Sequence, residues 1–352
     1  MIGVGLVGFG MSGRTFHAPI INSVEGLRLK KVVERHANKS QEIYPEVEVV
    51  RTIDELLVDP DIEIVVITVP NKEHFKLAMK SINAGKNVIV EKPFTVTYNE
   101  AMKLVEASKE KGVILSVYHN RRFDADFITI KKLIADGKLG EIVNYEARFD
   151  RFRSKIKQNS WKEEEQPGSG LLYDLGSHLI DQALVLFGNP TYVTGFMSIE
   201  RENGIIDDNF ELIMEYKDKR VSLKAGMMVR DNSLRYVING TKSTYVKTGI
   251  DVQEADLKAG KFPHNYDEWG KEPEKQYGKL IYEEDGAMNS EVVKSERGDY
   301  RLYYRDIREA ILNKREPNVT GMDGANVIKV IECALRSRDE KRTISFNMCN
   351  KH

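Results

Sequence analysis

The sequence predicts an α/β protein with two domains. Residues 1–120 have the pattern of a doubly wound parallel sheet, and residues 121–352 that of an α+β domain with an open, mostly antiparallel sheet. Three observations support this fold class. The chain of 352 residues is longer than one hydrophobic core usually serves. Its first third alternates β-rich runs with amphipathic stretches, which indicates strands covered by helices on both faces. Beyond residue 120, strand-like runs follow one another with few helices between them.

The first domain contains six β-rich runs separated by helical or turn patterns. The amphipathic stretches 71–85 and 98–112 each end in a glycine, as expected for a helix C-cap. The predicted strands lie at 2–8, 27–34, 46–50, 63–69, 87–90 and 113–118.

The second domain begins with a helix at 125–140 and a strand with alternating polarity at 141–152. A helix at 170–188 precedes several strands between 190 and 247, and two more helices are expected near 299–313 and 324–339. The charged, glycine-punctuated segment 250–298 is expected to be loop with one hairpin.

Composition excludes several classes of function. There are 53 Lys and Arg against 54 Asp and Glu, a net charge of -1, so no nucleic acid partner is expected. The apolar run 64–69 is far too short to span a membrane, and no basic signal segment opens the chain, so we expect a cytoplasmic protein. Cys333 and Cys349 have neither metal-site nor C-x-x-C spacing, so they are expected to be ordinary reduced thiols. Without a zinc motif, no metal is expected.

A glycine fingerprint follows the first predicted strand. Gly8, Gly10 and Gly13 form G-x-G-x-x-G between that strand and a helix. In this context the first glycine makes the turn, the second admits a pyrophosphate, and the third allows close packing. The sequence therefore predicts a Rossmann domain that binds NADP or NAD.

The end of the second strand gives conflicting signals about the cofactor. Glu34 is placed to accept hydrogen bonds from a ribose 2′-OH, which favours NAD. Arg35 and His36 beside it favour the 2′-phosphate of NADP, or are solvated loop charges.

Three residues form a candidate catalytic group. Lys92 follows the fifth strand, where a parallel sheet delivers ligand contacts. Asp174 and His178 are four apart on a predicted helix and therefore share a face. Alcohol oxidation requires a base of near-neutral pKa and a cation for the developing alkoxide. His178 alone would be taken for a core histidine, but together with Lys92 and the fingerprint it indicates a dehydrogenase.

Several stretches resemble one oxidoreductase family. "GLVGFGMSGRTFHAPII", "VEKPFTVT", "VYHNRRFDADF" and "GSGLLYDLGSHLIDQALVLFG" are similar to the glucose-fructose oxidoreductase/inositol dehydrogenase (Gfo/Idh/MocA) family, especially its NADP-dependent scyllo-inositol dehydrogenases. The resemblance implies that Lys92, Asp174 and His178 are catalytic, and that the C-terminal sheet forms homodimers or homotetramers. It places cofactor contacts at Phe9, Gly10, Met11, Ser12, Pro70, Asn71, His74 and Glu91, and substrate contacts at Asn120, Arg121 and Trp161.

We therefore expect an NAD(P)-dependent dehydrogenase of a cyclic polyol or sugar, with scyllo-inositol as the preferred substrate. One alternative keeps the chemistry but replaces the substrate by another sugar, a sugar nucleotide or a dihydrodiol. A second is a non-catalytic regulator that senses NAD(P). His17, in the first helix, is expected to have a structural role, with a contact to the cofactor as the alternative.

Overall fold

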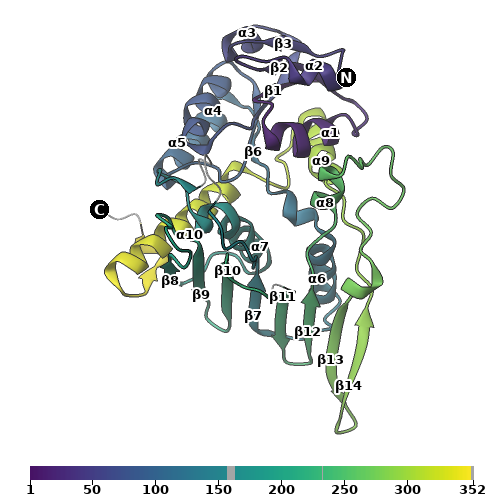
Figure 1. Cartoon of the computed structure of the whole chain (residues 1–352), viewed down its shortest axis with the longest axis vertical. Helices are drawn as coiled ribbons and strands as arrows, with labels where there is room; N and C mark the ends of the chain where they lie inside the picture. Colours follow the sequence, from purple (N-terminus) through teal and green to yellow (C-terminus); the bar gives the residue numbers. More distant parts are fainter. Residues whose placement is uncertain (157–162, 232, 350–352) are drawn as a thin grey trace. The chain divides into compact units, whose positions relative to one another are not determined.

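The computed structural model describes residues 1–156, 163–231 and 233–349, and the chain divides into two compact units (Figure 1). Unit 1 comprises Met1–Phe123, Gln253–Trp269 and Asp299–Ala325. Unit 2 comprises Asp124–Val252, Gly270–Gly298 and the chain from Asn326 onward. The boundary predicted at residue 120 lies close to Phe123, but the two later segments of unit 1 fall within the range 121–352 that the sequence pattern assigns to the second domain.

Unit 1 contains a six-stranded sheet in the order β3-β2-β1-β4-β5-β6, with every adjacent pair parallel. The order changes direction at β1, which lies between β2 and β4. In a sheet of this kind, ligands bind beyond the carboxyl ends of the strands at such a switch point. This confirms the predicted doubly wound sheet. The strands are β1 Ile2–Val7, β2 Leu27–Val33, β3 Glu48–Val50, β4 Ile62–Ile67, β5 Asn87–Val90 and β6 Leu115–Val117.

Helices of unit 1 begin and end largely where the sequence signals predict. Thr97 and Glu100 form a capping box at the start of α5, and Gly112 ends that helix with φ of 64°. The core under β1 also contains Trp269, Tyr303 and other residues of the two later segments. The helices are α1 Ala18–Ile21, α2 Lys39–Ile43, α3 Ile53–Leu57, α4 His74–Asn83, α5 Tyr98–Lys111, α8 Gln253–Lys258 and α9 Arg301–Leu312.

Unit 2 contains a nine-stranded sheet in the order β14-β13-β12-β11-β7-β10-β9-β8-β15. The β7 and β10 strands are parallel, and the other neighbouring strands whose pairing is known are antiparallel, as predicted. The strands are β7 Ile142–Arg148, β8 Tyr192–Ser198, β9 Asn209–Glu215, β10 Arg220–Gly226, β11 Leu234–Gly240, β12 Ser243–Thr248, β13 Gly278–Glu284, β14 Ala287–Val293 and β15 Ile344–Ser345.

The two faces of this sheet differ in burial. Alternate side chains such as Val193, Leu212 and Leu223 are fully buried. On the other face of β8, Tyr192 is 44% and Phe196 58% exposed, which leaves apolar side chains on a solvated surface. The helices of this unit are α6 Ala125–Ala135, α7 Ser177–Phe187 and most of α10 Gly321–Glu340.

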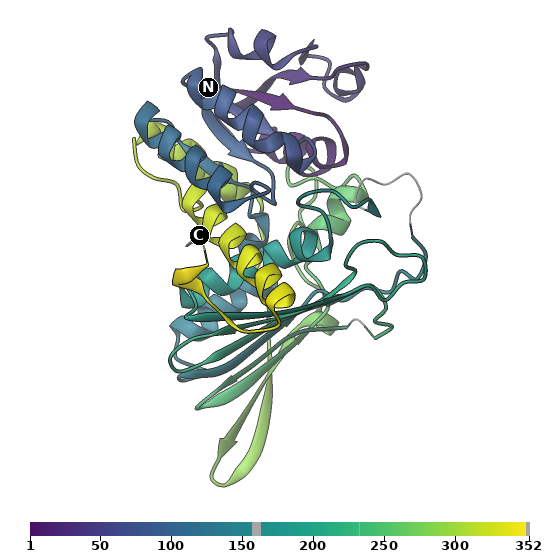
Figure 2. The same ribbon diagram turned by 90° about the vertical axis from the view of Figure 1, so that its left-hand side faces the viewer.

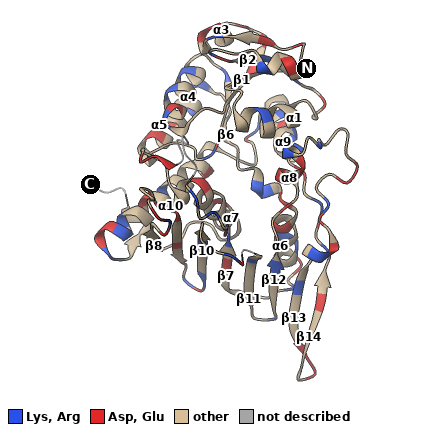
Figure 3. Cartoon of the chain, in the orientation of Figure 1, with Lys and Arg blue, Asp and Glu red and all other residues tan. Residues whose placement is uncertain are grey.

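The segment between 250 and 298 contains the predicted hairpin and also α8. Strands β13 and β14 are joined at Asp285 and Gly286, which both have positive φ, as a two-residue Asp-Gly hairpin turn requires. Figures 1 and 2 show this hairpin extending beyond the other strands of its sheet. Acidic and basic residues are interspersed over the elements of both units (Figure 3). No helix in the described part of the chain is long and apolar enough to cross a membrane.

Candidate functional site

The glycine loop begins at the carboxyl end of β1. Gly8 has φ of +99°, a conformation that glycine alone adopts readily. A Cβ on Gly13 would lie 2.3 Å from the Gly8 carbonyl oxygen, so only glycine lets the following π-helical turn, Gly13–His17, pack here. A Cβ on Gly10 would have nothing within 4 Å. The exposed backbone of Gly10 is therefore open to an anion, as the fingerprint predicts.

A cavity of about 940 Å³ lies at the carboxyl ends of β1, β2 and β4. Its size is within the range of small-molecule sites, and it includes the switch point of the sheet. The loop geometry and this cavity together fit a dinucleotide. Six of the predicted cofactor residues line it, which are Gly8, Phe9, Gly10, Glu34, Arg35 and Pro70.

Glu34 lines this cavity, but its carboxylate is bound within the protein. Its Oε2 accepts a hydrogen bond from the Lys39 backbone N–H (3.1 Å), and its Oε1 accepts from the Ser40 N–H (2.8 Å) and hydroxyl (2.6 Å). The side chain therefore satisfies amide groups at the start of α2. Arg51 fixes the same loop, because its guanidinium donates to the carbonyl oxygens of Glu34 and Ala37, each at 2.7 Å.

The cavity is also lined by exposed cations. Arg35 follows Glu34, Lys39 opens α2, and Lys72 lies in the 3₁₀ turn after β4. Glu73, in the same turn, also lines the cavity. The carboxylate of Glu34 is already hydrogen-bonded within the protein. The cations therefore offer positive charge where the adenosine ribose of a dinucleotide is expected.

Lys92 and Glu91 follow β5 directly, and the Lys92–Pro93 peptide bond is cis. Glu91 is 8% exposed and accepts hydrogen bonds from Ser12 Oγ, from His17 Nε2 (2.9 Å) and from the Lys92 backbone N–H (2.8 Å). Burial raises the pKa of this carboxyl group, but the hydrogen bond and charge of His17, the ammonium of Lys92 and the hydroxyl of Ser12 outweigh burial and hold the pKa at about 2. Glu91 is thus an anion that joins the glycine loop to Lys92.

His74 is 1% exposed and lies between two loops of the site. Its Nε2 is 2.9 Å from the Val69 carbonyl oxygen, and its Nδ1 is 3.0 Å from that of Pro93. Burial lowers the pKa of this imidazole. The predicted cofactor contact at His74 therefore corresponds to a residue that ties together the backbones after β4 and β5, while Asn71 beside it is also buried.

Asp174 and His178 come from a single helix of unit 2, as predicted. The helix is not regular, because Asp174 lies in a π-helical turn, Leu172–Gly176, and His178 in the first turn of α7. Single π turns within helices are frequent at functional sites. Asp174 is half-buried and His178 is 6% exposed. Lys92 belongs to unit 1 and this pair to unit 2, so their joint action is part of the proposal below.

Asp207 anchors the start of this helix and was not predicted. Its Oδ2 accepts a hydrogen bond from the Leu172 N–H (3.2 Å), and its carbonyl oxygen accepts one from the Leu171 N–H (3.0 Å). Burial raises the pKa of Asp207, against the opposing effect of the Leu172 amide. A Cβ on Gly170 would lie 2.2 Å from the Asp207 carboxylate, so this approach requires glycine.

The predicted substrate contacts have different surroundings. Asn120 and Arg121 lie in a short 3₁₀ turn after β6 and are 8% and 4% exposed. The Arg121 guanidinium forms an ion pair with Glu254 of α8, which is in the same unit. Trp161 lies outside the described residues.

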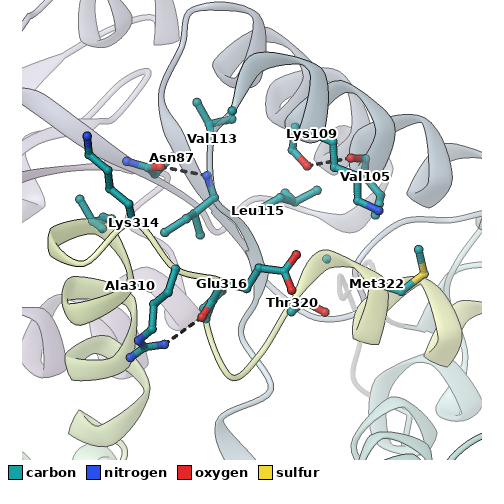
Figure 4. Close-up of a pocket in the computed structure, with 17 residues that line it drawn as sticks. Asn87, Val105, Lys109, Val113, Leu115, Ala310, Lys314, Glu316, Thr320 and Met322 are labelled. Atoms are coloured by element: carbon teal, nitrogen blue, oxygen red, sulfur yellow. Dashed lines mark hydrogen bonds between the residues drawn. The ribbon is translucent and has the colours of Figure 1, made fainter.

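A second cavity, of about 830 Å³, lies at the amino-terminal ends of β5 and β6 (Figure 4). Asn87 and Leu115, the first residues of these strands, line it with the end of α5 and the loop after α9. The side chain of Asn87 accepts a hydrogen bond from the Ile114 N–H there (2.9 Å). Among the described residues, none of the predicted site residues lines this cavity, and it lies at the edge of the sheet opposite to the usual ligand crevice.

Two family models match the chain in order. The first, described as "Oxidoreductase family, NAD-binding Rossmann fold", matches residues 2–119, and the second, "Oxidoreductase family, C-terminal alpha/beta domain", matches residues 131–346. The chain belongs to the Gfo/Idh/MocA oxidoreductase family. This confirms the resemblance found in the sequence, and the protein is an oxidoreductase that binds NAD or NADP.

Relatives extend over nearly the whole chain. The scyllo-inositol 2-dehydrogenase (NADP(+)) IolW of Bacillus subtilis (strain 168) is 42% identical over 97% of this chain and 95% of its own length. The uncharacterized oxidoreductase YdgJ of Escherichia coli (strain K12) is 39% identical over 97% of this chain and 98% of its own. A solved structure of the oxidoreductase yvaA from Bacillus subtilis matches with a TM-score of 0.95 at 42% identity, covering 98% of both chains.

The structure places six of the predicted cofactor residues on one cavity and joins Ser12, Glu91 and Lys92 by hydrogen bonds, whereas Met11 is exposed and does not line the cavity. Several further residues that shape this region gave no signal in the sequence. Ser40 and Arg51 shape the loop after β2, and Asp207 anchors the helix of Asp174. The Tyr304 hydroxyl lies 2.6 Å from His17 Nδ1. None of these residues stands within a recognisable motif, because each acts on a partner distant in sequence or through a loop with no periodic pattern.

Proposed function

We propose that this protein is an NADP-preferring dehydrogenase that oxidises a secondary alcohol of a cyclic polyol, with scyllo-inositol as the first candidate. The observation that carries the proposal is the link between the Lys92 backbone and the glycine loop. Glu91 makes this link, because it accepts hydrogen bonds from the Lys92 N–H and from the Ser12 hydroxyl. The backbone that carries the Lys92 side chain is thereby fixed at the carboxyl end of β5, where catalytic groups of such sheets act. The name of the Bacillus subtilis relative supports the choice of substrate and cofactor.

The chemistry follows from three side chains. When bound, the nicotinamide cofactor supplies the hydride acceptor. Lys92 donates a hydrogen bond to the alcohol oxygen and stabilises the negative charge that develops there. His178 takes the hydroxyl proton as general base, and Asp174 orients the imidazole or accepts a hydrogen bond from a neighbouring hydroxyl. In the reverse direction, the same groups polarise a ketone and return the proton.

The preference for NADP rests on the loop after β2. The carboxylate that would select a free ribose 2′-OH belongs to Glu34, and it is occupied by Lys39 and Ser40 at distances of 2.6 to 3.1 Å. Arg35 and Lys39 are exposed on the cavity that Glu34 lines. A phosphate monoester is recognised by such cations, whereas an unmodified ribose gains little from them.

The proposal is tested by substrate profiling with both cofactors. Purified protein is mixed with NADP⁺ or NAD⁺ and with scyllo-inositol, myo-inositol, glucose, levoglucosan or a sugar nucleotide, and reduced cofactor is followed by absorbance. We expect turnover on an inositol with NADP⁺, and its loss in Lys92→Ala and His178→Gln. Turnover confined to a sugar nucleotide would rule out an inositol substrate. Cofactor binding without turnover on any polyol or sugar would instead favour the regulator.

A further inference from the structure

A buried chain of hydrogen bonds in unit 1 joins the glycine loop, the lysine segment and helix α9. The carboxylate of Glu91 is at its centre, with Ser12 and His17 on Oε1 and the Lys92 backbone on Oε2. On its other side, His17 Nδ1 lies 2.6 Å from the hydroxyl of Tyr304. His17 is 0% exposed, so the protein alone supplies the hydrogen-bond partners of its ring.

The partners of His17 define which nitrogen carries hydrogen. An ionised carboxylate only accepts hydrogen bonds, so Nε2, which faces Glu91, must be protonated. A hydroxyl both donates and accepts, so Tyr304 donates to Nδ1 of a neutral ring and accepts from a charged one. In either state the N–H directed at Glu91 is retained. The geometry thus gives the imidazole a directional task that an apolar ring of the same size would not perform.

Glu91 depends on this donor because it is almost completely buried. A buried carboxylate that loses a partner has no water to replace it and either reorients or takes up a proton. Both outcomes weaken its bond with Ser12, which fixes the far side of a loop that is otherwise open at Gly10. Both also weaken its bond with the backbone N–H of Lys92.

We propose that His17 is a positioning residue that holds Glu91 in the orientation in which it fixes both the dinucleotide loop and Lys92. The effect on Lys92 rests on the function proposed above, whereas the effect on the loop requires only that the protein binds the cofactor. From the sequence, His17 is expected to have a structural role in the first helix. The inference makes that role specific, because one N–H of the ring organises two parts of the site.

A packing role is the competing explanation. The His17 ring lies against that of Tyr118, with centroids 4.1 Å apart, and its removal would leave a cavity. Two comparisons separate packing from hydrogen bonding. His17→Gln keeps a donor amide at about the position of Nε2, whereas His17→Ala does not. Tyr304→Phe removes the hydroxyl that contacts His17. Tyr303→Phe removes a hydroxyl from the preceding residue of the same helix, where it lies 2.6 Å from Ser116 Oγ.

The experiment measures the dissociation constant of NADPH by fluorescence for the full-length variants, with thermal unfolding recorded for each. His17→Ala is expected to bind NADPH roughly tenfold more weakly, as loss of one charge-assisted hydrogen bond implies, and His17→Gln to recover most of this loss. Tyr304→Phe is expected to weaken binding roughly threefold, with Tyr303→Phe within about twofold of the wild type. With a polyol that is turned over, His17→Ala also lowers kcat besides raising KM for NADP⁺, because Lys92 is displaced.

Unchanged NADPH affinity in a folded His17→Ala variant would overturn the inference. So would a His17→Gln variant that binds no better than His17→Ala at equal thermal stability, because the ring would then serve packing alone. Equal losses of NADPH affinity in Tyr304→Phe and Tyr303→Phe would also overturn it, because the hydroxyl on His17 would then have no specific effect. These measurements need no polyol, so absence of turnover in the wild type counts against the proposed function and leaves the test of His17 intact.

Discussion

Replacement of Arg35 by alanine tests the preference for NADP most directly. Arg35 is exposed at the cavity, next to a glutamate whose carboxylate is engaged by α2. If its guanidinium binds the 2′-phosphate, Arg35→Ala removes a partner of that phosphate, a group that NADP⁺ carries and NAD⁺ lacks. The affinity for NADP⁺ should fall while that for NAD⁺ stays the same.

The size of the effect follows from the exposure of the side chain. A hydrogen bond to a charged group contributes about 1.5 to 3 kcal/mol, and solvent and salt reduce the contribution at an exposed site. The lower end, about 1.5 kcal/mol, corresponds to a loss of about tenfold in affinity. Lys39 and Lys72 remain and retain part of the attraction.

Isothermal titration calorimetry with NADP⁺ and with NAD⁺ measures both affinities without a substrate. Lys76→Ala is the matched control, because Lys76 is an exposed residue of α4 that does not line the cavity, and its loss changes the net charge equally. We expect Arg35→Ala to weaken NADP⁺ binding about tenfold, NAD⁺ binding less than about twofold, and Lys76→Ala to change neither. The difference should shrink at high salt. A parallel loss for both cofactors, or the same loss in Lys76→Ala, would refute the reasoning.

Three further predictions concern catalysis, acid stability and assembly. Lys92→Ala should lower kcat by at least 10² to 10³-fold with unchanged circular dichroism, and near-normal turnover would exclude the proposed role. Glu91 has a pKa of about 2 against an ordinary 4.5, so its ionised form stabilises the fold by about 3 kcal/mol above pH 4.5, and this stabilisation is lost as the pH falls towards 2. In urea unfolding, Glu91→Gln should accordingly have a lower free energy of unfolding than the wild type at neutral pH, and this difference should narrow below pH 4.5. A difference that stays constant with pH would contradict this assignment. The last prediction assumes that the exposed face of the unit 2 sheet joins copies of the chain. Phe196, whose side chain is 58% exposed, lies on that face, so Phe196→Lys should shift the mass measured by light scattering towards that of the monomer. The same oligomer in the variant and the wild type would locate the interface elsewhere.

The sequence signals for the dinucleotide site are local. Three glycines between a strand and a helix have few other uses, and the carboxyl ends of parallel strands meet at one edge. The structure accordingly places Gly8, Gly10 and Pro70 on one cavity. The side chain of Glu34 was ambiguous for a physical reason: its orientation is decided by amide groups of α2, which become available only after the loop has folded.

Other features escaped prediction because they depend on distant partners. A regular helix was expected at Asp174, and the π turn found there accompanies an anchor, Asp207, that lies in a different part of the chain. The role of His17 depends on Glu91 and Tyr304, which are 74 and 287 residues away. A single histidine in a helix gives no signal of such partners.

The discontinuity of unit 1 in the sequence has a consequence for folding during translation. Its core needs Trp269 and Tyr303 beside residues of the first strand, so emergence of the first 123 residues does not yet supply a finished domain. Synthesis must continue to about residue 325 before the last of its segments is available. During that interval the nascent sheet exposes apolar surface that the later segments cover in the folded unit, and at an elongation rate of about 5 to 20 residues per second the exposure lasts on the order of ten seconds or more.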